Sequence, residues 1–334
     1  MKIRAVVFLV FVLGTGISLW SQVKGYMSFS YLKGESGNAS DGSFEGIRVG
    51  LYFLGDVSAN IDYLAELHYT LDSSFDIDQA WLRLKPSEAF NLVLGLYLVP
   101  FGKYNLVNRP HQTSLVQAPL TVEYLYPERW RDIGLLAVGS LGNFFYSAYL
   151  GNGLAESENL AAGQQFRDNN ADKGKGGRVG LSLSQWFEMA YSVYHCRYDD
   201  EGTRDLTSQG LDLTWSVDDF QLLAEYTRIR LENPENFTPG EAEGFFVQFV
   251  WNRSTLRPVV SYQQLRFEDG FHGKGFAGVG GAGQGISFER SRWALGIGYW
   301  LAPKAVIKLE YDFNREKENE VKNDVFILQI AVSF

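Results

Sequence analysis

The chain has 334 residues and a formal net charge of −9, from 30 Lys and Arg against 39 Asp and Glu. This acidic balance argues against a nucleic-acid-binding protein, which normally carries a basic face. A single Cys excludes a disulfide framework and a cysteine-rich metal site. Aromatic residues reach 15% and Gly numbers 35, while mean hydropathy is only −0.14. The composition excludes disorder, collagen and bundles of membrane helices, and it favours an all-β protein.

The first residues predict export. Lys2 and Arg4 precede an apolar stretch, and Ser21 offers a small residue at a cleavage point. A positive start, an apolar core and a small residue at the cut are typical of a secretory signal peptide. A membrane anchor is the alternative, but Gly and polar residues interrupt a run shorter than the roughly 20 residues of a spanning helix. We expect residues 1–21 to be removed and residues 22–334 to form the mature domain.

Strict alternation of apolar and polar residues follows along most of the chain. One face of the segment 59–70 carries Glu66 and His68, and one face near the end carries Lys308, Glu310 and Asp312, each opposite an apolar face. Period two marks strands with two different faces. In a membrane barrel the apolar face meets lipid and the polar face lines a wet lumen, whereas a soluble sandwich buries its apolar face.

About sixteen such segments are present, close to the number in a general porin. Tight turns between them interleave with long polar loops, which is typical of outer-membrane barrels with short periplasmic turns and long external loops. A soluble all-β protein, the alternative, has no reason to alternate in this way. The sequence predicts a transmembrane antiparallel β-barrel with strands at 23–32, 44–54, 59–70, 76–84, 89–98, 132–140, 143–151, 177–185, 186–197, 209–217, 219–230, 243–252, 256–266, 291–300, 304–314 and 324–334.

The aromatic residues and the last strand fit a barrel. Tyr and Trp favour the membrane–water boundary. The last predicted strand is apolar on one face and stops at Phe334. It resembles the signal that the barrel-insertion machinery of Gram-negative outer membranes recognises, so we expect that machinery and outer-membrane lipid as partners. Eight aromatic residues near strand ends are assigned to the lipid face: Tyr31, Tyr52, Tyr69, Tyr191, Tyr226, Trp251, Trp293 and Tyr299.

Three short motifs carry a family resemblance. Pro100-Phe101-Gly102 closes the fifth predicted strand, Arg131-Asp132-Ile133-Gly134 opens the sixth, and Gly151-Asn152-Gly153 ends the seventh. In this order and spacing they resemble the phosphate-selective porin O/P family of Gram-negative outer membranes, most closely over residues 75–153. The resemblance implies a sixteen-stranded, usually homotrimeric barrel whose third long loop folds into the lumen and narrows the pore.

The third long loop of this chain is residues 99–131, and it is the longest. Apolar residues such as Leu106, Val107 and Leu120 need somewhere to pack other than open water. A loop folded into the lumen supplies that place, and a surface-exposed cap is the alternative.

Charges at such a constriction would set selectivity, because narrow walls focus the electric field. The loop's basic excess is slight, and the dense ladder of Arg and Lys on which the family's phosphate specificity relies is missing. The four basic residues Lys103, Arg109, Arg129 and Arg131 predict only a slight preference for anions, with phosphate as one candidate solute. The candidate pore-lining residues are Lys103, Arg109, Glu123, Arg129 and Arg131 on or beside the loop, and Arg48, Glu66, His68 and Arg83 on neighbouring strands.

The sequence thus predicts a porin for passive diffusion of small hydrophilic solutes or ions, with no catalysis, cofactor, metal or nucleic acid. The four His share no metal-ligand spacing, and an outer-membrane enzyme would need a Ser–His or Asp–His arrangement that the sequence does not indicate. The segment 278–283 fits a dinucleotide-binding pattern but lies in a loop between strands, without the helix that the pattern requires. A structural or adhesive barrel with a plugged lumen is the remaining alternative.

Overall fold

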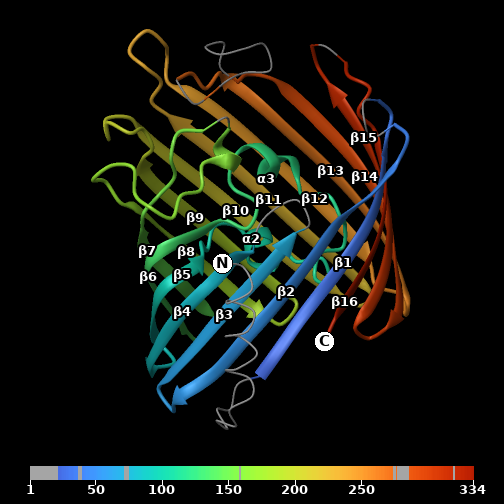
Figure 1. Cartoon of the computed structure of the whole chain (residues 1–334), viewed down its shortest axis with the longest axis horizontal. Coiled ribbons are helices and arrows are strands. Elements are labelled where there is room, and N and C mark those ends of the chain that lie inside the picture. The colour runs from blue at the N-terminus through green and yellow to red at the C-terminus, as the bar shows by residue number, and fades with distance from the viewer. Residues whose placement is uncertain are drawn as a thin grey trace, which may run out of the picture.

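A computed structural model describes residues 22–36, 40–70, 75–157, 159–273, 276, 286–318 and 320–334. Sixteen antiparallel strands in this part of the chain form a closed barrel (Figure 1), in which β1 pairs with β16. Closure leaves no unpaired strand edge, which is what a sheet needs in lipid. The predicted signal peptide and the glycine pattern at 278–283 lie outside the described residues.

The strands are β1 (Gln22–Gly34), β2 (Ser43–Ser58), β3 (Ile61–Thr70), β4 (Asp76–Ser87), β5 (Phe90–Leu98), β6 (Arg131–Leu141), β7 (Phe144–Gly151), β8 (Gly174–Ser184), β9 (Phe187–Arg197), β10 (Asp205–Val217), β11 (Phe220–Leu231), β12 (Gly240–Trp251), β13 (Leu256–Asp269), β14 (Glu289–Ala302), β15 (Ala305–Glu316) and β16 (Val325–Ser333). Each coincides with one predicted segment, so the predicted fold class is confirmed. Several strands run further into the long loops than predicted; β10, for example, begins at Asp205 instead of 209. Polar residues continue the hydrogen-bonded ladder there, beyond the apolar alternation that the prediction followed.

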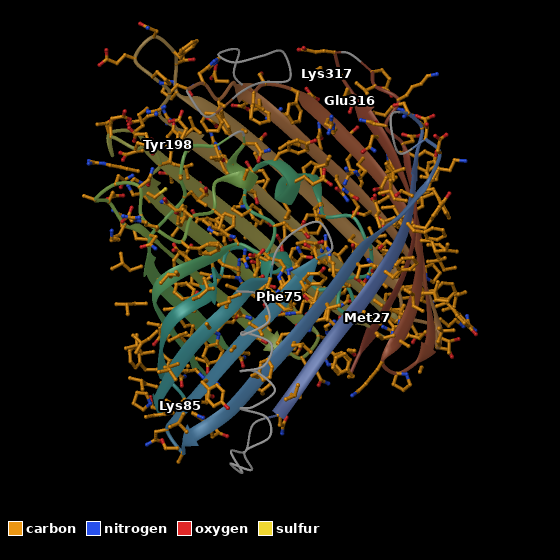
Figure 2. All side chains as sticks on the ribbon, viewed as in Figure 1. Met27, Phe75, Lys85, Tyr198, Glu316 and Lys317 are labelled. Carbon is orange, nitrogen blue, oxygen red and sulfur yellow. The ribbon has the colours of Figure 1, made fainter. Side chains whose placement is uncertain are left out.

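Short and long connections lie at opposite rims of the barrel (Figure 1). The connections after the even-numbered strands β2 to β14 have two to four residues, and the longest connection at the other rim is 99–130. Figure 2 places Lys85 at the short-turn rim and Tyr198, Glu316 and Lys317 at the long-loop rim. The predicted asymmetry is therefore confirmed.

The two faces of the wall have opposite chemistry. Large apolar side chains are exposed on the outside, as Met27 and Phe75 illustrate in Figure 2. The inside buries charged residues that a water-soluble protein would normally leave on its surface. This inversion is what a barrel between lipid and an aqueous lumen requires. Buried inward-facing charged residues include Glu66, Asp78, Asp132, Arg178, Asp212, Glu225, Arg292, Lys308, Glu310 and Asp312.

The assignment of aromatic residues to the lipid face is correct at seven of the eight positions and wrong at Tyr52. Its ring lies 5.9 Å from that of Tyr26 and beneath the guanidinium of Arg109, at 5.3 Å, inside the barrel. Tyr52 shares its strand face with Arg48, so the alternation itself indicates the lumen. The assignment of Tyr52 to the lipid face was wrong because it followed the general preference of Tyr for the membrane boundary instead of the alternation.

The loop after β5 lies inside the barrel, as predicted, and contains the short helices α2 (Tyr104–Val107) and α3 (Leu120–Tyr124) (Figure 1). Its two ends meet, because the amide of Val99 donates to the carbonyl of Trp130 at 2.8 Å. The side-chain amide of Asn105 bridges the same two residues, at 2.8 and 3.0 Å. A further short helix, η2 (Leu160–Ala162), belongs to the loop after β7. No helix in the described ranges is long and apolar enough to cross a membrane.

Candidate pore constriction

The inward loop rests on an aromatic core along the wall of β7 to β12. Phe101, Tyr126, Trp130 and Tyr194 have no exposed surface. The rings of Trp130 and Tyr194 lie 4.6 Å apart, and those of Phe101 and Tyr126 lie 5.4 Å apart. Each such pair contributes about 0.5–1.5 kcal/mol beyond the free energy of burial. The apolar residues of the loop thus have a dry packing site inside the barrel.

The first motif of the family resemblance anchors the start of this loop. Phe101 enters the aromatic core, and Gly102 turns the chain with a φ of +67°. A Cβ at Gly102 would lie 2.5 Å from a carboxylate oxygen of Glu225, so the position needs glycine both for its backbone and for space. The same carboxylate accepts a hydrogen bond from the backbone amide of Tyr104. The motif therefore fixes where the loop leaves the wall.

The other two motifs form one unit on adjacent strands. The carboxylate of Asp132 accepts hydrogen bonds from the backbone amides of Asn152, at 2.8 Å, and Gly153, at 3.0 Å. A Cβ at Gly151 would lie 2.3 Å from this carboxylate, which explains the glycine. Asp132 therefore ties the start of β6 to the end of β7. The three motifs are architectural, and only Arg131 among their residues joins the charge cluster described next.

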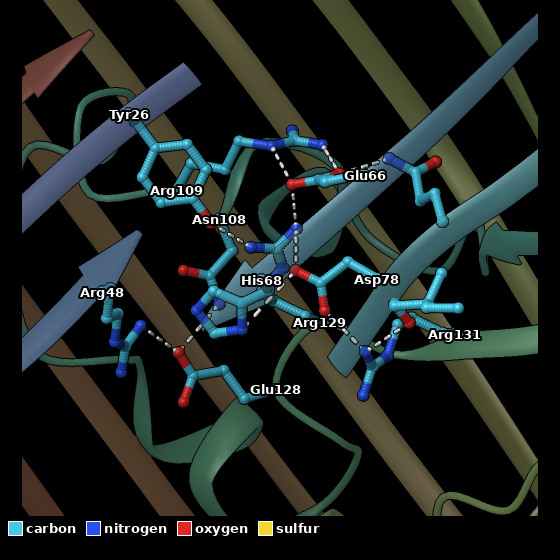
Figure 3. Close-up of polar contacts among 12 residues, drawn as sticks. Tyr26, Arg48, Glu66, His68, Asp78, Asn108, Arg109, Glu128, Arg129 and Arg131 are labelled. Carbon is cyan, nitrogen blue, oxygen red and sulfur yellow. Dashed lines mark hydrogen bonds and ion pairs between the residues drawn. The ribbon is translucent and has the colours of Figure 1, made fainter. Parts of the chain in front are cut away.

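A cluster of charges forms where the loop meets β3 and β4 (Figure 3). The guanidinium of Arg129 lies 2.6 Å from Glu66 and 2.8 Å from Asp78. Arg109 pairs with Glu66 at 3.0 Å, and Arg131 pairs with Asp78 at 2.6 Å. Both carboxylates are buried, so each charge is compensated where an unpaired one would be costly. We name Glu66, Asp78, Arg109, Arg129 and Arg131 the constriction cluster.

Arg129 occupies the centre of the constriction cluster in a constrained conformation. Its φ of 55° is uncommon for a residue other than glycine. Its guanidinium also donates to the hydroxyl of Tyr26 at 2.7 Å. Burial disfavours its charged form, but the opposing effect of Glu66, Tyr26 and Asp78 is larger and raises the pKa of Arg129 above its ordinary value. Arg129 therefore stays charged. Its guanidinium points to Glu66 and Asp78, while the next residue, Trp130, points into the aromatic core.

His68 and one further ion pair border the cluster (Figure 3). The Nδ1 atom of His68 lies 3.7 Å from Asp78. Arg48 on β2 pairs with Glu128 on the loop at 3.2 Å, and both side chains are more than a third exposed. Six of the nine predicted site residues thus lie in or beside the constriction cluster, together with their partners Asp78 and Glu128.

Three predicted site residues lie elsewhere. Lys103 pairs with Glu188 of β9 at 2.9 Å, and Glu123 pairs with Arg292 of β14 at 3.0 Å. Arg83 pairs with Asp62 at 2.5 Å, near the short-turn ends of β4 and β3 and away from the loop. The loop residues therefore reach opposite walls of the lumen, and Arg83 lines a different level. In the described part of the chain, no group of three or more His, Cys, Asp and Glu could hold a metal ion.

Solved structures of outer-membrane proteins share this architecture. OmpF of Salmonella typhi, solved with daunomycin, aligns with a TM-score of 0.67 at 14% identity, over 94% of this chain and 97% of that one. An anion-selective porin from Comamonas acidovorans aligns with a TM-score of 0.67 at 10% identity, over 94% and 99%. The trimer form of OmpT, an outer membrane protein of Vibrio cholerae, aligns with a TM-score of 0.64 at 13% identity, over 94% and 99%.

These similarities establish a sixteen-stranded barrel of the porin type. At such low identity they establish the fold alone. No protein-family model matches the sequence, and no curated protein matches it either.

Sequence reasoning missed several residues that hold the loop from the opposite wall. The amine of Lys308 donates to the carbonyl of Pro110 at 2.7 Å and to the hydroxyl of Thr113 at 3.1 Å. The carboxylate of Glu310 accepts hydrogen bonds from the backbone amides of Val116 and Gln117. The alternation on β15 does place Lys308 and Glu310 in the lumen, but nothing local in the sequence indicates that the loop reaches them.

Proposed function

We propose that this barrel is an outer-membrane porin, a water-filled channel for passive diffusion of small hydrophilic solutes and ions. The observation that carries the proposal is the constriction cluster. Loop cations meet wall carboxylates inside a sixteen-stranded barrel, where fixed charges of both signs act on any passing solute. In this proposal the chain needs no catalytic group, cofactor or metal.

The location and assembly follow from the same proposal. Residues 1–21 serve as a cleaved signal peptide, and the strand that ends at Phe334 directs insertion into the outer membrane of a Gram-negative-type bacterium. The mature chain forms a homotrimer. Support comes from the exposed apolar outer surface and from the trimer form of the similar Vibrio cholerae protein.

Selectivity is proposed to be weak and towards anions. Three guanidinium groups face two carboxylates in the constriction cluster, which leaves one positive charge in excess. Each cation is already paired, and so is Lys103. We therefore propose that phosphate passes as one small anion among others. Specificity for phosphate, the finer implication of the O/P resemblance, would need cations with free donors.

Planar-bilayer recording tests the proposal. Purified protein should give discrete conductance steps in KCl, grouped in threes for a trimer, and a KCl gradient should give a reversal potential of the sign that favours chloride. Block by low phosphate would instead support phosphate specificity. A folded barrel that inserts and never conducts would overturn the porin proposal.

The second candidate is a plugged structural or adhesive barrel. It is favoured by the number of wall strands that hold the loop, since Glu66, Glu188, Glu225, Gln263 and Glu310 on five different strands all bond to it. Uptake of small sugars into vesicles containing the protein separates the two candidates, because a plugged barrel would keep the vesicles from swelling.

A further inference from the structure

A cavity of about 330 Å³ lies between the loop and the wall formed by β10 to β13. Binding sites for small molecules span about 300–1,000 Å³, so this one suits a compact solute. Gln221 is the second residue of β11, and Gln248 lies three residues before the end of β12. Both positions are close to the short turns, so the cavity lies on the short-turn side of the loop.

Side-chain amides dominate the polar lining. Five glutamines contribute to it: Gln112, Gln117, Gln221, Gln248 and Gln263. An amide both donates and accepts hydrogen bonds, as a hydroxylated ligand requires. Two of them also hold the loop. The side chain of Gln117 donates to Glu123 at 2.7 Å, and the side chain of Gln263 accepts from the backbone amide of Leu120 at 3.0 Å. The side chains of Gln221 and Gln248 have no hydrogen-bond partner among the described residues.

Thr214 adds a third polar group without a partner in the described part of the chain. Its hydroxyl is buried, lines the cavity, and lacks a hydrogen-bond partner within the described ranges. A buried polar group without a partner is costly unless water or a ligand satisfies it. Register places Thr214 opposite Leu223 on β11, and Leu223 opposite Gln248 on β12, so these groups form one row across the wall.

The cavity offers no uncompensated charge. Lys103 is the one charged residue among the described residues that line it. Its amine lies 2.9 Å from Glu188, which also pairs with Arg178 at 3.0 Å. An ion entering the cavity would lose hydration without gaining a free counter-charge. The lining therefore favours a neutral solute over phosphate or another ion.

An apolar surface completes the site. Tyr104 lines the cavity, and its ring packs against that of Phe246, with ring centroids 5.9 Å apart. Leu115 and Leu223 add aliphatic surface. A sugar presents hydroxyl groups around its edge and C–H groups on its faces, so amides can bind the edge while an aromatic ring contacts a face.

We infer that this cavity is a binding site for a neutral polyhydroxylated solute of the size of a mono- or disaccharide. Gln221, Gln248 and Thr214 bind its hydroxyl groups, and Tyr104 contacts its apolar face. The inference rests on the proposed porin function and assigns a solute class to one part of the lumen.

The test is ion current through single channels in KCl, with maltose added on the short-turn side. We expect a saturable decrease in current. A polyethylene glycol of equal hydrodynamic radius should reduce the current without saturation, and sodium phosphate at the same concentrations should show no saturable block. Saturation-transfer NMR of maltose with the full-length protein in detergent measures binding independently of conduction.

Two variants locate the site. The double change Gln221→Leu and Gln248→Leu should raise the half-saturating concentration of maltose about tenfold, because hydrogen bonds to the sugar are lost. Thr214→Val, in which the new side chain has nearly the same shape, should raise this concentration by a smaller factor. It provides a second measurement if the double variant does not fold. Gln209→Leu, on the exposed outer face of β10, is the matched control and should change nothing.

The outcomes separate the two proposals. Conductance steps with no saturable maltose block, a block equal to that of the polymer, or a block unchanged in both lumen variants would overturn the sugar site and leave the porin proposal in place. An inserted barrel that never conducts would overturn the porin proposal. The sugar site would then also fail if NMR showed no transfer to maltose.

Discussion

The two sides of the lumen hold the same loop by different physical means. On the side of β7 to β12, the loop packs Phe101 and Trp130 into an aromatic core with no exposed surface. On the side of β3 and β4, it is held by charge pairs centred on Arg129. The two modes alternate along the chain, because Trp130 of the aromatic core lies between Arg129 and Arg131, which both pair with Asp78.

The difference has a physical consequence. Apolar packing is favourable almost regardless of which apolar neighbour is present, whereas a buried charge is tolerated only beside its partners. The aromatic side therefore fixes the position of the loop. The ionic side determines the electrical character of the lumen, and it depends on every member of the constriction cluster.

The largest expected effect is on the aromatic side. Trp130→Ala should lower the free energy of unfolding by about 3–5 kcal/mol, because it removes a fully buried indole from contact with Phe101 and Tyr194. Urea unfolding in detergent, followed by far-ultraviolet circular dichroism, measures the change. Trp186→Ala, at an exposed position, is the control. Equal effects of the two changes would show that the aromatic core does not hold the loop.

Removing the central cation should be nearly as severe. Arg129→Met leaves Glu66 and Asp78 without their shared partner, at a cost of about 3–5 kcal/mol. The reversal potential in a KCl gradient should move towards cation preference. Adding Glu66→Gln should recover part of both losses. Arg83→Met, which breaks a pair at the short-turn end, should leave the reversal potential close to that of the parent.

Acid should loosen the ionic side and spare the aromatic side. Burial, together with Arg109 and Lys308, lowers the pKa of His111 to about 4, and Arg129 adds to this while Glu66 opposes it. An unfolded His has a pKa of about 6.5. The undocked loop therefore binds the proton more readily, so docking is fully stabilised above about pH 6.5 and loses that stabilisation as the pH falls towards 4.

Single-channel current noise measures this effect. Noise should rise between pH 6.5 and 4 in the parent protein and remain flat in His111→Asn. Identical pH profiles of the two proteins would assign the acid response to other groups.

The smallest effect is expected at the exposed rim of the cluster. Arg48 and Glu128 pair at 3.2 Å with both side chains more than a third exposed. Their interaction should contribute less than about 1 kcal/mol and weaken in high salt. A double-mutant cycle with Arg48→Gln and Glu128→Gln measures it. If the coupling energy between Arg48 and Glu128 were as large as that between Arg129 and Glu66, buried and exposed ion pairs would contribute equally, contrary to this prediction.

The sequence predicted which strand residues face the lumen, but it did not predict which of them the loop contacts. Alternation assigned Glu66, His68, Lys308 and Glu310 to the inner face, where the structure has them. Which inner-face charges the loop reaches is a different question. Arg109 and Arg129 are 43 and 63 residues from Glu66 in the sequence, and no local pattern connects them. The motifs behind the family resemblance indicated the correct architecture, yet they secure the ends of strands and loop instead of forming the charge cluster.

By itself, the sequence determined the number of strands, their two faces and the alternation of turns and loops, and it favoured entry of the third long loop into the lumen over a surface-exposed cap. These features follow from local rules, because every strand between lipid and water must alternate and a long loop with apolar residues must bury them. Only the tertiary structure decided how the loop crosses the lumen, which carboxylates compensate Arg129, and where an amide-lined cavity remains. Those outcomes depend on the closure and register of all sixteen strands, which place residues far apart in the sequence within bonding distance.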